Sequence, residues 1–448
     1  MNPECRTGGG AWKDGRVTEA LETTRRFGHG LARMTGRDPS EAKRAATPLE
    51  LLFDLAFVVA FGQAADQLAH FIADDHALLG LGGFVFAMFS ICWAWINFSW
   101  FASAFDTDDW FYRLTTLVQM IGVVVLALGI PALFHSLLEG NYVDNTLIVA
   151  GYVVMRVAMV AQWLRVARQD PAHRRTALTY VTFILIAQVG WAVLAALHVT
   201  LGTAVAASVA LFAIEIAGPL VAERRGGPTP WHAHHIAERY GLLAIIALGE
   251  VVFGTVASVA ALIEKQNWTV EAALVVFAGI GIAFGLWWTY FIAPSGEVLA
   301  RYRRRAFLWG DAHIILFASI AAVGAGLHVA AYVIEGESVV GVPGAILSIA
   351  IPMFIFVISS LALYAYLVSE LDPLHFGTSR PLVEIIDVFL QPKRALIDGV
   401  VVTPTLIGTN ADKRVVLMGD LSDKAQLQRI LNDLIGAADA PLAVEEPH

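Results

Sequence analysis

Cysteine and charge are both scarce in this sequence of 448 residues. Two cysteines, Cys5 and Cys92, are too few for a disulfide framework, which excludes a disulfide-stabilised secreted domain. Charged residues make up 15% of the chain and the net charge is −9, so a nucleic-acid-binding protein with a basic surface is excluded as well. Hydrophobic residues make up 57% of the chain. The remaining residues are too few to give a soluble protein of this size a polar surface. The composition therefore predicts a membrane protein.

The motifs of common enzyme classes are missing too. The chain contains no nucleophile elbow, phosphate-binding loop or paired-cysteine motif. We therefore predict that the protein is not an enzyme and has no catalytic residues and no cofactor. His235 and Glu238 are one helical turn apart, a spacing that allows metal binding. The adjacent basic loop favours a plain cytosolic helix start instead, so we expect no metal site.

Ten apolar segments are long enough to cross a bilayer as helices, since about 20 residues span its hydrocarbon core. Lipid offers the backbone no hydrogen-bond partners, so such segments must form helices or a closed barrel. They show no alternating polarity, which indicates helices. Their approximate limits are 50–72, 77–103, 114–134, 145–166, 177–197, 201–222, 240–263, 270–293, 306–334 and 344–369.

Lysine and arginine alternate between the loops. Basic clusters occur before the first segment and near 165–175, 224–239 and 301–305, whereas the loops near 74–76, 135–144, 198–203 and 335–337 have neither residue and the loop at 264–271 has Lys265 alone. The positive-inside tendency then predicts an even number of spans with both termini in the cytoplasm. Residues 1–46 are polar and lack the apolar core of a signal peptide, so we expect a disordered cytosolic tail there.

The sequence also shows signs of an internal repeat. The first and seventh segments each begin with a glutamate, Glu50 and Glu238, and the second and eighth each end in an aromatic stretch, 93–101 and 287–291. Segments one to four would then correspond to segments seven to ten in the same orientation. The alternative is that aromatic residues merely gather at membrane interfaces.

Several ionisable residues are expected at membrane depth, where a charge is costly. Glu50 and Asp54 are four residues apart and share one helix face. Arg156 needs a carboxylate partner from another helix. Either these side chains line a polar interior that passes a solute, or they only hold helices together. The candidates for this polar interior are Glu50, Asp54, Arg156, Glu215, Glu250 and Asp311, and any of the last three can pair with Arg156.

The composition changes after residue 370, where Pro373, Gly377 and Pro381 mark a linker. The pattern beyond it predicts a small α/β module over residues 380–440. The alternative is a degenerate cytosolic tail. The expected elements are strands at Leu382–Phe389, Val400–Ile407 and Arg414–Met418, and helices at Lys393–Asp398 and Ser422–Ile435.

Three motifs resemble the bacterial low temperature requirement A (LtrA) membrane protein family. They are Thr47–Val58 (TPLELLFDLAFV), Phe105–Asp109 (FDTDD) and His235–Leu242 (HIAERYGL), the last continuing to Glu250. The resemblance spans residues 47–370 and implies a polytopic inner-membrane protein without a defined reaction. It also implies a family motif at a cytosolic helix start, made of His235, Glu238 and Arg239.

The tail is similar to the second half of KaiB, a circadian-clock protein, at Ile386–Val388, Val400–Leu406 and Gly419–Asp423. This resemblance implies a partial thioredoxin-like module that binds a protein partner. The first strand and helix of KaiB have no counterpart, because the tenth apolar segment takes their place. The module contains no cysteine, which excludes thioredoxin-type redox chemistry. Its candidate partner-binding residues are Thr403, Pro404, Gly419 and Asp420.

Together these patterns predict an all-α polytopic membrane protein with a small C-terminal α/β module. We expect it to be transporter-like for a small solute or ion, with the lipid bilayer around it and a cytosolic protein bound to its tail. The alternative is a membrane-anchored sensor or scaffold that docks a KaiC-like ATPase or another signalling partner, which would connect it to a rhythmic process.

Overall fold

The computed structural model describes residues 30–41, 44–140, 142–197, 199–368, 405–410 and 413–418. Within these ranges, ten helices are long and apolar enough to cross a membrane. They are α2 (Pro48–Ala73), α3 (Ala77–Phe105), α4 (Trp110–Glu139), α5 (Thr146–Gln169), α6 (Arg174–Ala196), α7 (Leu201–Gly226), α8 (Ala233–Gln266), α9 (Val270–Phe291), α11 (Ala306–Glu335) and α12 (Gly341–Val368). The short helix α10 (Ser295–Arg301) and a 3₁₀ turn (Arg303–Arg305) connect α9 to α11. The predicted ten apolar helices are thus confirmed.

The helix limits follow local signals that hydropathy alone does not carry. Thr47 caps α2: its hydroxyl accepts from the Glu50 backbone N–H, while the Glu50 side chain accepts from the Thr47 N–H. The largest difference from prediction is the start of α8, at Ala233 instead of residue 240. There the His232 side chain accepts from the backbone N–H of His235. The first turns of α8 contain polar residues, so hydropathy does not identify them as part of the apolar segment although they are helical.

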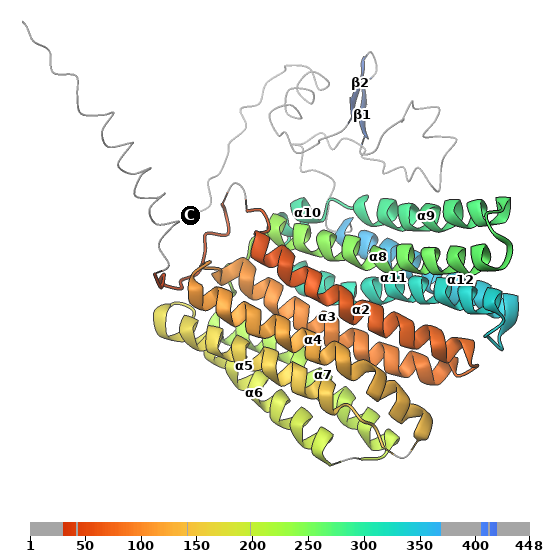
Figure 1. Ribbon diagram of the computed structural model, residues 1–448. Helices are drawn as coiled ribbons and strands as arrows, with labels where there is room; N and C mark the ends of the chain where they lie inside the picture. Colours follow the sequence, from red (N-terminus) through yellow and green to blue (C-terminus); the bar gives the residue numbers. More distant parts are fainter. Residues whose placement is uncertain are drawn as a thin grey trace, which may run out of the picture.

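The helices lie side by side in one bundle (Figure 1), and their contacts divide eight of them into two groups of four that pack in the same order. In the first group α2 packs on α3 and α4, and α4 packs on α5; in the second group α8 packs on α9 and α11, and α11 packs on α12. This is the arrangement that an internal repeat would give, and aromatic residues gathering at interfaces would not explain it. The two groups meet where α2 contacts α8 and α11.

Glycine allows the closest helix contacts in both groups. A methyl group at Gly151 of α5 would lie 2.4 Å from the backbone nitrogen of Leu126 in α4. One at Gly326 of α11 would lie 2.4 Å from the carbonyl oxygen of Ser348 in α12. Without a hydrophobic driving force between helices in lipid, such close backbone packing is a main source of helix association.

The interior is aromatic and the outer faces are apolar. Phe53 of α2 stacks on Phe98 of α3 with ring centroids 3.7 Å apart, and both side chains are fully buried. On the outside, large apolar side chains such as Phe277 and Phe354 remain exposed. A soluble protein would bury these groups, whereas lipid accommodates them.

Two strands follow the helices in the described part of the tail. β1 (Thr405–Asn410) pairs antiparallel with β2 (Lys413–Met418), with Thr405 opposite Met418. They overlap two of the predicted strands. The other predicted elements of the module, and the candidate residues Thr403, Pro404, Gly419 and Asp420, lie outside the described residues. The α/β module therefore remains a prediction.

Candidate functional site

The two acidic residues of the first motif bind basic residues of α8. The Asp54 carboxylate accepts from Arg239, with 3.1 Å between Arg239 Nε and Asp54 Oδ2, and from the Trp95 indole at 2.6 Å. Glu50 Oε1 lies 3.2 Å from both His235 Nε2 and Arg239 Nη1. All five side chains are fully buried. The expected shared face of Glu50 and Asp54 is therefore turned toward α8.

This cluster extends to two residues that flank the helices. Arg44, just before α2, lies 3.4 Å from Glu50 and 3.5 Å from Asp106, which follows α3. Burial raises the pKa of Asp106 to about 6, and the nearby Glu50 charge acts in the same direction, while Arg44 opposes it. We call Arg44, Glu50, Asp54, Asp106, His235 and Arg239 the N-terminal cluster, because it gathers at the N-termini of α2 and α8.

Residues 31–41 cover this end of the bundle, and we call them the strap. The Ala32 backbone N–H donates to Asp109 at 3.1 Å, and Arg165 binds both Asp109 and the Ala32 carbonyl. The Gly36 backbone N–H donates to Asp170 at 2.8 Å, and Met34 is fully buried. Part of the N-terminal segment that sequence alone places in a loose tail thus packs across the helix ends.

A second group of charges lies at the middle of the bundle, between α3, α5, α6 and α7. Arg156 donates to Glu215 at 2.9 Å and to the Tyr152 hydroxyl at 2.6 Å. Glu215 also accepts from the Trp93 indole at 2.7 Å and from Gln188 at 3.3 Å. Of the three carboxylates that the sequence offers to Arg156, the structure places Glu215 beside it.

Glu250 and Asp311 belong to neither group. Within the described residues, no hydrogen bond or ion pair reaches either carboxylate, although Glu250 is buried and Asp311 is half-buried. The six residues expected to line one polar interior therefore fall into separate places. Glu50 and Asp54 lie in the N-terminal cluster, Arg156 and Glu215 form a pair, and the remaining two stand alone.

The histidine motif at the start of α8 separates into two environments. His235 is buried against Glu50, whereas Glu238 is exposed. The two side chains therefore do not share a site, and no group of three or more potential metal ligands occurs in the described part of the chain. Arg239, the third motif residue, binds Asp54.

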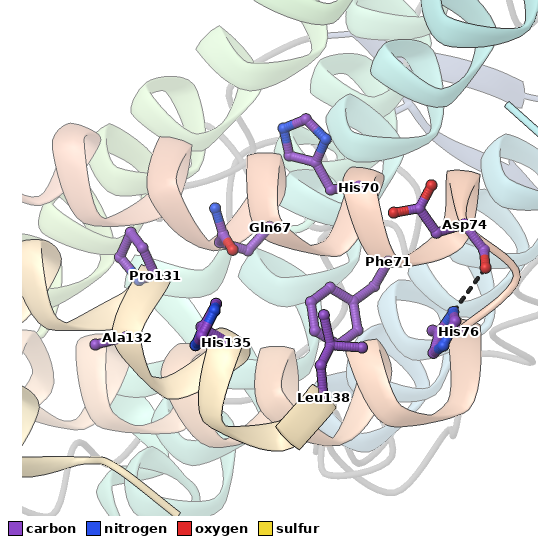
Figure 2. Close-up of a pocket in the computed structure, with 9 residues that line it drawn as sticks. All are labelled: Gln67, His70, Phe71, Asp74, His76, Pro131, Ala132, His135 and Leu138. Carbon is purple, nitrogen blue, oxygen red and sulfur yellow. Dashed lines mark hydrogen bonds between the residues drawn. The ribbon is translucent and has the colours of Figure 1, made fainter. Parts of the chain in front are cut away.

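A pocket of about 630 Å³ opens at the opposite end of α2. Gln67, His70 and Asp74 line it from the α2 side, and Pro131 and His135 line it from α4 (Figure 2). We call this the pocket end. Thus one end of α2 is buried among ion pairs and the other borders an open, partly polar pocket.

Sequence reasoning missed several partners. Arg44 counted only as loop charge and Trp95 only as an interface aromatic, because hydropathy does not show which loops fold back over helix ends. Asp106 belongs to the motif Phe105–Asp109, which was the one sequence feature that could have indicated its role. His70 gave no signal, because an isolated histidine near a helix end is common.

Comparison with known proteins agrees with this architecture. Residues 45–404 match the sequence profile of the bacterial low temperature requirement A proteins (LtrA). A Rhizobium meliloti (strain 1021) protein described as uncharacterized is 27% identical over 226 residues, 48% of this chain and 51% of that protein, so the chain spans about half the length of this relative. No solved structure matches the chain. Because the family match covers most of the sequence, the chain belongs to the bacterial low temperature requirement A family.

Proposed function

We propose that this protein is a transporter-like member of its family that moves a small solute or ion across the bacterial inner membrane. The observation that carries the proposal is the asymmetry of α2. Its N-terminal end is closed by the buried cluster and the strap, while its other end borders a pocket of about 630 Å³. One end that is closed and an opposite end that borders an open pocket are the asymmetry that alternating access requires.

The proposed moving parts are the two groups of four helices. The N-terminal cluster joins them through Asp54 of α2 and Arg239 of α8. Opening this end requires that the ion pairs separate and the strap lift. The arginine distribution of the loops supports a cytoplasmic location for this end and for both termini. No step of this mechanism requires catalysis or a cofactor.

The test is flux through the full chain reconstituted in liposomes, followed with a pH-sensitive dye for protons and with labelled Na⁺ and K⁺. We expect Asp54→Asn and Glu250→Gln to abolish flux. Asp108→Asn is the control, because the Asp108 side chain forms an exposed ion pair with Arg113 and only its backbone N–H, which the substitution keeps, binds the cluster at Asp106. Flux that is absent in the native protein, or unchanged in both variants, would count against transport.

A second candidate is a membrane-anchored scaffold, and the tail favours it. The family match ends at residue 404, and the hairpin of β1 and β2 begins at Thr405. The hairpin thus lies after α12 and outside the family match, where the proposed KaiB-like docking module would continue. The full chain in detergent should then retain a KaiC-like ATPase that a chain ending at residue 379 does not. Equal retention by both chains would remove this candidate, and the membrane domain alone would carry the function.

A further inference from the structure

Glu250 differs from the other buried charges in being enclosed without a partner. It lies near the middle of α8 and is 4% exposed, and no hydrogen bond or ion pair reaches it within the described residues. A methyl group at Gly62 of α2 would lie 3.3 Å from Glu250 Oε1. One at Gly324 of α11 would lie 2.7 Å from the Glu250 carbonyl carbon. Glycines of both neighbouring helices thus make room for this residue where the two groups of four helices meet.

The surroundings of Glu250 supply no positive partner. The nearest titratable side chains of the packed helices stand one turn beyond each glycine, Asp66 on α2 and His328 on α11. On α9, which also packs on α8, the one charged residue is Glu271 at the exposed start of the helix. An ionised carboxylate without a cation or hydrogen-bond donors is very costly in a protein interior. A carboxyl group that holds a proton is uncharged and avoids most of this cost.

Three polar side chains lie between the level of Glu250 and the pocket end, Asp66 and His70 on α2 and Tyr332 on α11. Asp66 Oδ1 lies 3.6 Å from His70 Nε2, and the Tyr332 hydroxyl lies 3.3 Å from the same nitrogen. His70 borders the pocket, and its imidazole projects from α2 on the side away from His135 (Figure 2). The side chains of His70 and Asp66 are both about half exposed, at 52% and 43%, so both lie at the pocket end, and Asp66 is the next acid toward Glu250.

The opposite direction is blocked by apolar packing. Glu250 and Arg239 are eleven residues apart on α8, which is about 16 Å along the helix axis. Between these levels, Phe57 and Phe61 of α2 and Phe317 of α11 are fully buried. No polar connection to the N-terminal cluster is present among the described residues at this level. Glu250 is therefore approached from the pocket end.

We propose that Glu250 is a proton-binding site loaded from the pocket end through His70 and Asp66. This inference rests on the proposed transport function and names its coupling ion as the proton. In each step a proton from solvent binds His70, passes to the Asp66 carboxylate and then to the Glu250 carboxylate. His70 and Asp66 return to their earlier states, and only the charge of Glu250 changes, from −1 to 0.

The experiment uses the full chain in liposomes of known orientation and the carboxyl reagent dicyclohexylcarbodiimide, which modifies protonated carboxyl groups in membranes. Mass spectrometry measures the modification of Glu250 while the pH on each side is varied separately. We expect the modification to fall as the pH at the pocket end rises and to be insensitive to the pH at the other end. Glu250→Gln should lose the modified peptide.

The path is tested by the rate of response to a pH jump at the pocket end. His70→Ala and Asp66→Asn should slow the response by about 100-fold, the scale of a lost proton-transfer group. His135→Ala is the matched control, because His135 lies on the other wall of the same pocket and pairs with Glu139 at 3.6 Å. Equal rates in His70→Ala and His135→Ala would overturn the path.

A second measurement covers the case in which the reagent does not reach the site. The infrared band of a protonated carboxyl group should be present in the native chain and missing in Glu250→Gln. Absence of both the band and the modification would overturn the site. Proton binding at Glu250 without any flux in the liposome assay would instead refute only the proposed transport, so the two failures are distinguishable.

Discussion

Asp54 and Arg239 occupy the same position in two helices. Each is the seventh residue after the N-cap of its helix, Thr47 for α2 and His232 for α8, and their side chains bind each other with Arg239 Nε 3.1 Å from Asp54 Oδ2. Three residues after the same caps stand Glu50 and His235, which also pair. The N-cap register thus makes His235, and not the Glu238 that the sequence pattern matched, the counterpart of Glu50, and the two helices meet through complementary charges at equivalent positions.

The first prediction concerns this pair. Asp54→Asn leaves the buried Arg239 without its main counter-charge, and breaking a buried ion pair in this way costs about 3–5 kcal/mol. We expect the unfolding free energy, measured by denaturant titration in mixed micelles, to fall by that amount. Asp108→Asn breaks the exposed pair with Arg113 and should change it by less than about 1 kcal/mol.

Replacing both partners by apolar residues separates charge from packing. The double variant Asp54→Leu with Arg239→Met removes both charges of this pair. Glu50, which loses Arg239, keeps Arg44 and His235, so the variant should recover most of the loss. Recovery should be incomplete by about 1–3 kcal/mol, since the Trp95 indole loses its acceptor. A double variant less stable than Asp54→Asn would show that the pair is not the source of the stability.

The second prediction is a pH dependence that arises at Asp106. Burial and the nearby Glu50 raise the pKa of Asp106 to about 6 from an ordinary value of 3.8. A raised carboxyl pKa stabilises the fold fully below the unfolded value and loses this contribution as the pH rises through the folded value. The free energy of unfolding should therefore fall between about pH 4 and pH 6, by at most about 3 kcal/mol. Asp106→Asn should flatten this part of the profile; an unchanged profile would contradict the assignment.

The pH dependence of the unfolding free energy that arises at Asp109 should have the opposite sign. Burial opposes its ionisation, but hydrogen bonds from Arg165 and from the backbone N–H groups of Tyr112 and Ala32 outweigh burial and lower its pKa. The stability from this residue is present above the unfolded pKa and is lost as the pH falls through the folded pKa. The loss of unfolding free energy in Asp109→Asn should thus be largest at neutral pH. In acid, the denaturant unfolding curves of the variant and the native chain should converge.

The third prediction tests close helix packing. Gly151→Ala would place a methyl group 2.4 Å from the Leu126 backbone nitrogen, so α4 and α5 must move apart. We expect a loss of about 1–3 kcal/mol, the usual cost of overpacking. At Gly82 of α3 a methyl group meets open space, and alanine there should stabilise by about 0.5–1 kcal/mol through helix propensity. Thermal unfolding of both variants measures the difference; similar melting temperatures would contradict the close contact.

Hydropathy predicted the helices well because it depends on length and composition, which sequence shows directly. Which helices are neighbours in the bundle could not be predicted in this way. Arg156 had three possible partners, since apolar patterns do not reveal which helices touch, and only the packing of α5 on its neighbours selects Glu215. Likewise Glu50 and Asp54 were recognised as one face, but the helix they face was not predictable.

The expected single polar interior failed for a similar reason. Depth in the membrane can be inferred from position along each segment, whereas rotation of one helix against another cannot. Glu250 and Glu215 are both near the middle of their helices. The Glu215 carboxylate nevertheless points to Arg156, whereas the Glu250 carboxylate points to Gly62 of α2. Shared depth thus did not imply a shared site.

The last prediction concerns the pair at mid-bundle. Glu215 accepts from Arg156, Trp93 and Gln188, which lie on three different helices. Glu215→Gln keeps the shape but leaves Arg156 as an uncompensated charge far from water, so it should cost about 3–5 kcal/mol. Arg156→Met in the same chain removes that charge and should restore most of the stability. Denaturant titration of the single and double variants gives the coupling energy; if the two effects simply add, Arg156 and Glu215 do not act as a pair, and the four helices around them are held together by packing alone.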